Sequence, residues 1–122
     1  MATDFRSGTD FPRRGREEFG GFLWLLRLFD KARAAADGTI HDYIYPCPMD
    51  QGVMERWGIA APAFDAAVRR ERSDAAIHAW LQGHVDAAHR ERANRWLIDE
   101  KADNLDRQDA EEGVAIATDN GQ

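Results

Sequence analysis

The chain of 122 residues contains very little cysteine, little proline and no long hydrophobic run. Its one cysteine cannot form an internal disulfide, which favours a reducing compartment. The longest apolar run, residues 22–26, is far shorter than the roughly 20 residues that cross a bilayer. No apolar segment of a secretory signal follows the first methionine. We therefore expect a cytoplasmic protein that does not associate with membranes.

An excess of basic charge is also absent, because the net charge is −6. Residues 99–122 hold eight acidic and two basic residues, and residues 1–98 hold 14 of each. A nucleic-acid footprint needs a basic patch of one sign, so the composition argues against a nucleic-acid partner. We expect a surface arm at residues 1–14, a single helical domain at 15–102 and an acidic, mobile tail at 103–122.

The signatures of several catalytic classes are missing. There is no glycine-rich phosphate loop, no CxxC pair and no nucleophile elbow. His78, His84 and His89 are six and five residues apart, whereas a zinc-binding helix places two histidines four residues apart. The sequence therefore predicts neither a metal site nor a cofactor.

The strongest pattern that is present is an amphipathic helix of about four turns after Gly20 and Gly21. Its leucines at 23 and 26 fall within its charged stripe, which a surface helix normally keeps polar. We therefore expect residues 21–36 to form a central helix that packs on more than one side. Its charges should then be partly buried and paired.

Charged residues on this helix form the first candidate site. They are Arg27, Asp30, Lys31 and Arg33. The spacing of three residues lets Asp30 pair with Arg27 or with Arg33. Such a cluster could clamp a carboxylate or phosphate, or it could be a structural ion-pair network. Tyr43 and Tyr45 could direct hydroxyls at the same ligand, or could lie at the edge of the core with satisfied hydroxyls.

The cysteine forms the second candidate site. Pro48 suits the first position of a helix, which makes Cys47 its N-cap, where the amides and the helix dipole favour a thiolate. His41 or Asp50 could then handle protons in a thiol-dependent enzyme. Against this, Asp50 would repel a thiolate, and a free cysteine usually packs as a small hydrophobe. The sequence leaves open whether the protein is an enzyme.

The rest of the chain is mostly helical by its pattern. We expect a short extended segment at residues 39–47, and then helices at 48–57, from Pro62 and after Ser73. A last helix spans about residues 87–101, although the pattern leaves open whether 74–101 is one helix or two. The predicted fold is an all-α, compact bundle of about five helices around the helix at 21–36.

Two motifs in this order resemble a known family. The first motif, W-L-x-R-x-x-D-K-A-R, is carried by Trp24, Leu25, Arg27, Asp30, Lys31, Ala32 and Arg33. The second motif, Y-x-Y-x-C-P-x-D, is carried by Tyr43, Tyr45, Cys47, Pro48 and Asp50. Over about residues 12–82 the chain resembles the small bacterial proteins grouped as domain-of-unknown-function family 5069. The resemblance implies a cytoplasmic, mostly helical domain and implies no activity.

Three functions follow as hypotheses. The preferred one is a binding domain in which Arg27, Lys31 and Arg33, oriented by Asp30, hold a small anionic ligand beside Tyr43 and Cys47. The second is a thiol-dependent enzyme. The third is a structural or interaction protein, in which the charges form an internal network and the domain works through its surface or as a homo-oligomer.

Overall fold

The computed structural model describes residues 11–40 and 43–112, and these residues form six α-helices and no strand. The helices are α1 (Leu25–Asp37), α2 (Pro48–Trp57), α3 (Ala61–Arg70), α4 (Asp74–Gln82), α5 (Ala87–Glu100) and α6 (Ala102–Glu111). The predicted all-α bundle is therefore confirmed. The outer parts of the predicted arm and tail, residues 1–10 and 113–122, lie outside the described residues. Within the described chain, no helix has both the length and the apolar character needed to cross a membrane.

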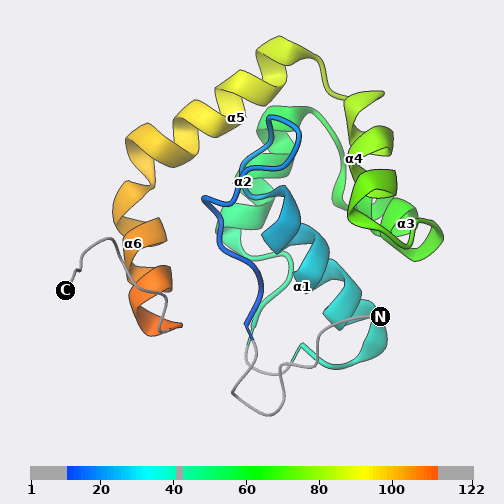
Figure 1. Ribbon diagram of the computed structural model, residues 1–122, viewed down its shortest axis with the longest axis horizontal. Coiled ribbons are helices and arrows are strands. Elements are labelled where there is room, and N and C mark those ends of the chain that lie inside the picture. The colour runs from blue at the N-terminus through cyan, green and yellow to red at the C-terminus, as the bar shows by residue number, and fades with distance from the viewer. Residues whose placement is uncertain (1–10, 41–42, 113–122) are drawn as a thin grey trace.

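Helix α1 lies between two groups of helices. On one side it packs against α3 and α4, which also contact each other (Figure 1). On the other side lie α2 and α5, which form the most extensive helix contact, and α5 turns directly into α6. Figure 1 shows α5 and α6 running around the edge of the molecule, with the blue segment before α1, residues 11–24, between α6 and α1.

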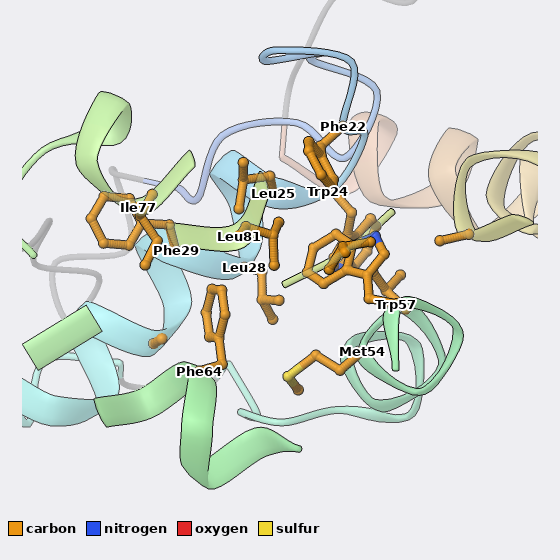
Figure 2. Packing of buried hydrophobic residues seen from close by; sticks show 14 of the residues in the cluster. Phe22, Trp24, Leu25, Leu28, Phe29, Met54, Trp57, Phe64, Ile77 and Leu81 are labelled. Atoms are coloured by element: carbon orange, nitrogen blue, oxygen red, sulfur yellow. The ribbon is translucent and has the colours of Figure 1, made fainter. Parts of the chain in front are cut away.

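The core is built from aromatic and aliphatic side chains on both sides of α1 (Figure 2). Trp24 and Trp57 are almost completely buried, and the leucine at 26 is only 3% exposed although it lies in the charged stripe. Burial of one large apolar side chain contributes about 1.5–3 kcal/mol. The prediction that α1 packs on more than one side is therefore confirmed.

The central helix begins later than predicted. The segment expected at residues 21–36 is helical only from Leu25, because Gly21 and Trp24 have φ angles of 88° and 72°. The backbone N–H of Trp24 donates to the carbonyl oxygen of Gly15 at 2.8 Å, which fixes this turn against the N-terminal segment. Tryptophan rarely adopts left-handed backbone angles, so the hydrophobic periodicity of the sequence could not have located the start of the helix.

The later helices follow the sequence pattern more closely. Residues 48–57 form α2 as expected, and residues 74–101 contain two helices, α4 and α5. The expected extended segment at 39–47 forms no strand in its described residues, which make turns and irregular chain instead.

The predicted acidic tail does not begin where the helical structure ends, because α6 occupies its first part. Leu105 and Asp109 of α6 are only 2% and 4% exposed. Arg14 pairs with Asp109 at 2.7 Å, and Arg16 pairs with Asp106 at 2.7 Å. Composition alone indicated a solvated segment because the partners of these acids lie near the other end of the chain.

Candidate functional site

Three charged residues of α1 are buried. Arg27, Asp30 and Lys31 are 3%, 9% and 3% exposed. Buried charges need partners, and the partners in this protein come from three other segments of the chain. Asp30 binds Arg13, Lys31 binds Asp50 and Arg27 binds Glu112. The expected pairs within α1 are therefore replaced by longer-range pairs.

Asp50, at the start of α2, is fully buried and accepts three hydrogen bonds. The donors are Nε1 of Trp24 at 2.8 Å, Nζ of Lys31 at 2.7 Å and the backbone N–H of Cys47 at 2.9 Å. In return, Sγ of Cys47 caps the backbone N–H of Asp50 at 3.5 Å, and Nζ of Lys31 lies 3.4 Å from the same sulfur. The cluster joins α1 to α2, and its carboxylate is fully engaged.

Arg27 holds a carboxylate from the end of α6. Its Nη1 and Nη2 atoms donate to Oε1 and Oε2 of Glu112 at 3.0 and 2.6 Å, and the hydroxyl of Tyr43 donates to Oε2 at 3.0 Å. Burial by itself would lower the pKa of Arg27, but the hydrogen bonds and charge of Glu112 outweigh it and raise that pKa. Burial and the same carboxylate raise the pKa of Tyr43. The guanidinium expected to bind an external anion thus binds one from its own chain.

Asp30 belongs to a third cluster, which ties the N-terminal segment to α1 and α4. Arg13 donates to Asp30 through its backbone N–H at 2.9 Å, Nε at 3.0 Å and Nη2 at 2.8 Å. Its Nη1 also donates to Asp74, the first residue of α4, at 2.6 Å. The hydrogen bond from Arg13 lowers the pKa of Asp74. Asp30 therefore orients Arg13 and has no free oxygen for the neighbouring cations of α1.

The charged side chains of these clusters are engaged with one another. Four hollows on the described surface have volumes between about 220 and 540 Å³, and none of these four is lined by Arg27, Asp30, Lys31 or Cys47. His41 lies outside the described residues, so the base proposed for the thiol is not placed.

Arg33, the fourth charged residue of the predicted cluster, lies at a different place. Its Cζ atom lies 4.9 Å from the centre of the Phe29 ring. With Arg69 and Arg72 it lines a hollow of about 300 Å³ between the C-terminal ends of α1 and α3. Within the part of the chain that the structure describes, no hydrogen bond or ion pair engages these three guanidinium groups.

A second hollow adjoins the first, because Arg69 and Ala36 line both. It has a volume of about 220 Å³, and its lining also includes the alanines at 32 and 35, Tyr45, Pro46 and Asp65. The hydroxyl of Tyr45 donates to Oδ1 of Asp65, and burial together with this bond raises the pKa of Tyr45. We call the two adjoining hollows the Arg69 groove. It combines a basic part with a part lined by small apolar side chains.

The groove brings together two predicted site residues, Arg33 and Tyr45, and adds two that the sequence did not indicate. Arg69 is exposed on α3 and Arg72 is exposed just after it, where arginine is common and indicates no site. Their relation to Arg33 depends on how α3 packs on α1, for which the sequence carries no local signal. Among the described residues, no group of histidine, cysteine, aspartate and glutamate side chains is placed to hold a metal ion.

Comparison with known proteins identifies the family without adding an activity. No curated protein matches the chain. The sequence model of one family, described as "Domain of unknown function (DUF5069)", matches residues 9–119. The match includes α5 and α6 as well as the two motifs around Arg27 and Cys47. The chain therefore belongs to the DUF5069 family.

Proposed function

We propose that the protein binds a small anionic molecule in the Arg69 groove. One observation carries the proposal: three guanidinium groups that make no hydrogen bond or ion pair with the described residues line one hollow. The arginine at the centre of the protein differs, because Nη1 and Nη2 of Arg27 both donate to Glu112. The planar fork of arginine matches the oxygens of a carboxylate or phosphate, so three such groups favour an anion with several oxygens.

The charges of the groove support this choice of ligand. The basic hollow is lined by three arginines and by two acids, Asp37 and Glu71. Glu71 already binds Nε of Arg70 at 2.9 Å, so part of its charge is neutralised within the protein. The formal charge of the side chains that line the basic hollow is therefore +1, and the carboxylate of Asp65 in the adjoining hollow accepts a hydrogen bond from Tyr45. The adjoining alanine-lined hollow suits a small apolar group attached to the anion.

The buried cluster of α1 has a different role in this proposal. A ligand that used Arg27 or Lys31 would have to displace Glu112 or Asp50, and neither side chain of these pairs is more than 6% exposed. Removing one partner of a buried pair leaves a charge uncompensated and costs about 3–5 kcal/mol. The cluster therefore serves best as the network that fixes α1, from which Arg33 projects into the groove.

Thermal unfolding with two probes tests the proposal. Inorganic phosphate tests the anion site, and phenyl phosphate adds an apolar group for the alanine-lined hollow. A ligand that binds the native state raises the midpoint of unfolding, and about a hundredfold excess over Kd stabilises by about 2.7 kcal/mol. We expect phenyl phosphate to raise the midpoint more than phosphate does.

Matched variants identify the site. Arg69→Ala removes the arginine that lines both hollows and should abolish the shift. Arg107→Ala removes an exposed arginine of α6, 59% exposed, and should leave the shift unchanged. No shift at millimolar concentrations of either probe, or an equal shift in both variants, would contradict the proposal.

A second candidate function is thiol chemistry at Cys47. It is favoured by Nζ of Lys31, which lies 3.4 Å from Sγ, because a nearby ammonium stabilises a thiolate. The same ammonium binds Asp50 at the shorter distance of 2.7 Å, and no described side chain accepts a proton from the sulfur. The groove is therefore the better supported site.

A further inference from the structure

Helix α6 is attached to the rest of the protein mainly by ionic contacts. Its acidic face, defined as Asp106, Asp109 and Glu112, meets a basic face, defined as Arg14, Arg16 and Arg27. The three pairs have closest distances of 2.7, 2.7 and 2.6 Å. Asp106 and Asp109 are three residues apart on one side of α6, and Glu112 follows directly after the helix.

Apolar anchoring of α6 is slight by comparison. Leu105 is its only buried apolar residue, and it lies against Gly15 and Trp24. A β-carbon at Gly15 would lie 2.9 Å from Cδ2 of Leu105 and 2.4 Å from the indole of Trp24, so the glycine is needed for this contact. One buried leucine contributes about 1.5–3 kcal/mol without fixing a direction, whereas the three ion pairs fix the register of α6 on the body.

The bend between α5 and α6 is made at a single residue. Helix α5 ends at Glu100, α6 begins at Ala102, and Lys101 between them has φ −117° and ψ 18°. Neither glycine nor proline occurs from Asp99 to Leu105, and no side chain caps the start of α6. Lysine and alanine are good helix formers. The bend is therefore imposed by the docking of α6 rather than by the local sequence.

We call Lys101 the hinge; if it took helical backbone angles, α5 and α6 would join into one straight helix. With helical backbone angles at Lys101, α5 and α6 would form one helix over residues 87–111 of about 37 Å. Its acidic face would then point away from its own basic face. Both faces would be free for a partner that carries the complementary face.

We propose that the basic face also accepts α6 from a second copy of this chain. The product is a reciprocal dimer in which each α6 docks on the other copy and both hinges are straight. The charge complementarity is already present between α6 and the body, so the exchange needs no new contact and closes with two-fold symmetry. In the monomer, α6 docks on its own chain at a high effective concentration, and this docking competes with docking on a second copy. The dimer therefore forms at high protein concentration or when the contact within the monomer is weakened.

Two charge-reversed full-length variants test the exchange. Arg14→Glu with Arg16→Glu reverses the basic face, and Asp106→Arg with Asp109→Arg reverses the acidic face. Each variant repels its own α6, but in a mixture each helix matches the other variant's face. The control carries all four substitutions in one chain, which restores the attraction within the monomer.

Light scattering and hydrogen exchange give the result. We expect each variant alone to be monomeric with rapidly exchanging α6 amides, and the equimolar mixture to form a dimer in which α6 is protected. The control should stay monomeric and protected. A mixture that remains monomeric with unprotected α6, beside a control that regains protection, would overturn the proposal.

The natural chain supplies a second measurement that does not depend on the charge variants. At millimolar concentration it should contain a dimer fraction. Lys101→Gly should weaken that dimer about threefold for each hinge, and about tenfold for both, because glycine disfavours a continuous helix. A natural chain that is monomeric at this concentration, or a dimer unaffected by Lys101→Gly, would refute exchange through a straight hinge.

Discussion

Asp50→Asn removes the charge from the most deeply buried ion pair and keeps the shape of the side chain. Asp50 and Lys31 have side-chain exposures of 0% and 4%. An amide can present only one oxygen to Trp24, Lys31 and the backbone N–H of Cys47, and its own NH₂ group must face one of these donors. The ammonium of Lys31 also loses its counter-charge. We expect a loss of about 3–5 kcal/mol, against a total stability of about 5–15 kcal/mol.

A double-mutant cycle separates the pair from its surroundings. Lys31→Met removes the cation and leaves Asp50 with two donors, so it should cost about 3 kcal/mol. The double variant leaves neither side chain charged. Its cost should be smaller than the sum of the two single costs by at least about 2 kcal/mol, because residues in one buried cluster are coupled.

Urea unfolding at neutral pH, followed by tryptophan fluorescence, measures these free energies. Glu111→Gln is the matched control, because this glutamate is 66% exposed and lies 3.9 Å from Arg107. An exposed pair of this kind contributes about 1 kcal/mol or less. A loss below about 1 kcal/mol for Asp50→Asn, or single losses that simply add, would refute the argument that this cluster stabilises the contact of α1 with α2.

Other substitutions test further contacts. Gly52→Ala places a β-carbon 2.3 Å from Cη2 of Trp96, so it should cost about 1–3 kcal/mol in urea unfolding. In a Trp96→Ala background it should instead stabilise by up to about 1 kcal/mol, and equal effects in both backgrounds would contradict this contact. The pKa of Asp74 is lowered, so its contribution is present above the usual carboxyl pKa of 3.8 and is lost as the pH falls through the lowered value. Asp74→Asn should therefore reduce the loss of stability at acid pH. An unchanged loss would show that the pair of Asp74 with Arg13 does not contribute to it. Cys47→Ala should cost about 1 kcal/mol through loss of the N-cap. Iodoacetamide should label native Cys47 more slowly than the unfolded chain, and faster labelling would instead support thiol chemistry.

The sequence predicted the burial of charge on α1 but not the partners. The leucine at 26 lies within the charged stripe and indicated a helix packed on several sides, whereas the leucine at 23 precedes α1; Arg27, Asp30 and Lys31 are indeed buried. Their partners lie 85, 17 and 19 residues away along the chain. Helical spacing reveals neighbours three or four residues apart, so it suggested pairs within α1 and could not suggest these.

The candidate site was predicted only in part, for a related reason. Of the six side chains that the sequence indicated for an anion site, only Arg33 and Tyr45 line the Arg69 groove, and the other four lie elsewhere; these are Arg27, Asp30, Lys31 and Tyr43. The sequence could not indicate Arg69, because that position depends on how α3 lies on α1. The sequence likewise did not indicate the start of α6. An acidic segment is expected to be exposed to solvent unless the arginines that pair with it are known.

The pairing of Arg27 with Glu112 has a consequence for the order in which the chain is made. Arg13 leaves the ribosome before α1 and Asp50 soon after it, so two buried charges of α1 meet their partners early. Arg27 stays without its counter-charge until residue 112 has emerged. Domains generally fold as units during synthesis, and in this one the counter-charge of Arg27 is made only after α6. A nascent chain that stalls before Glu112 therefore presents an unpaired arginine in an unfinished core, which exposes it to quality control.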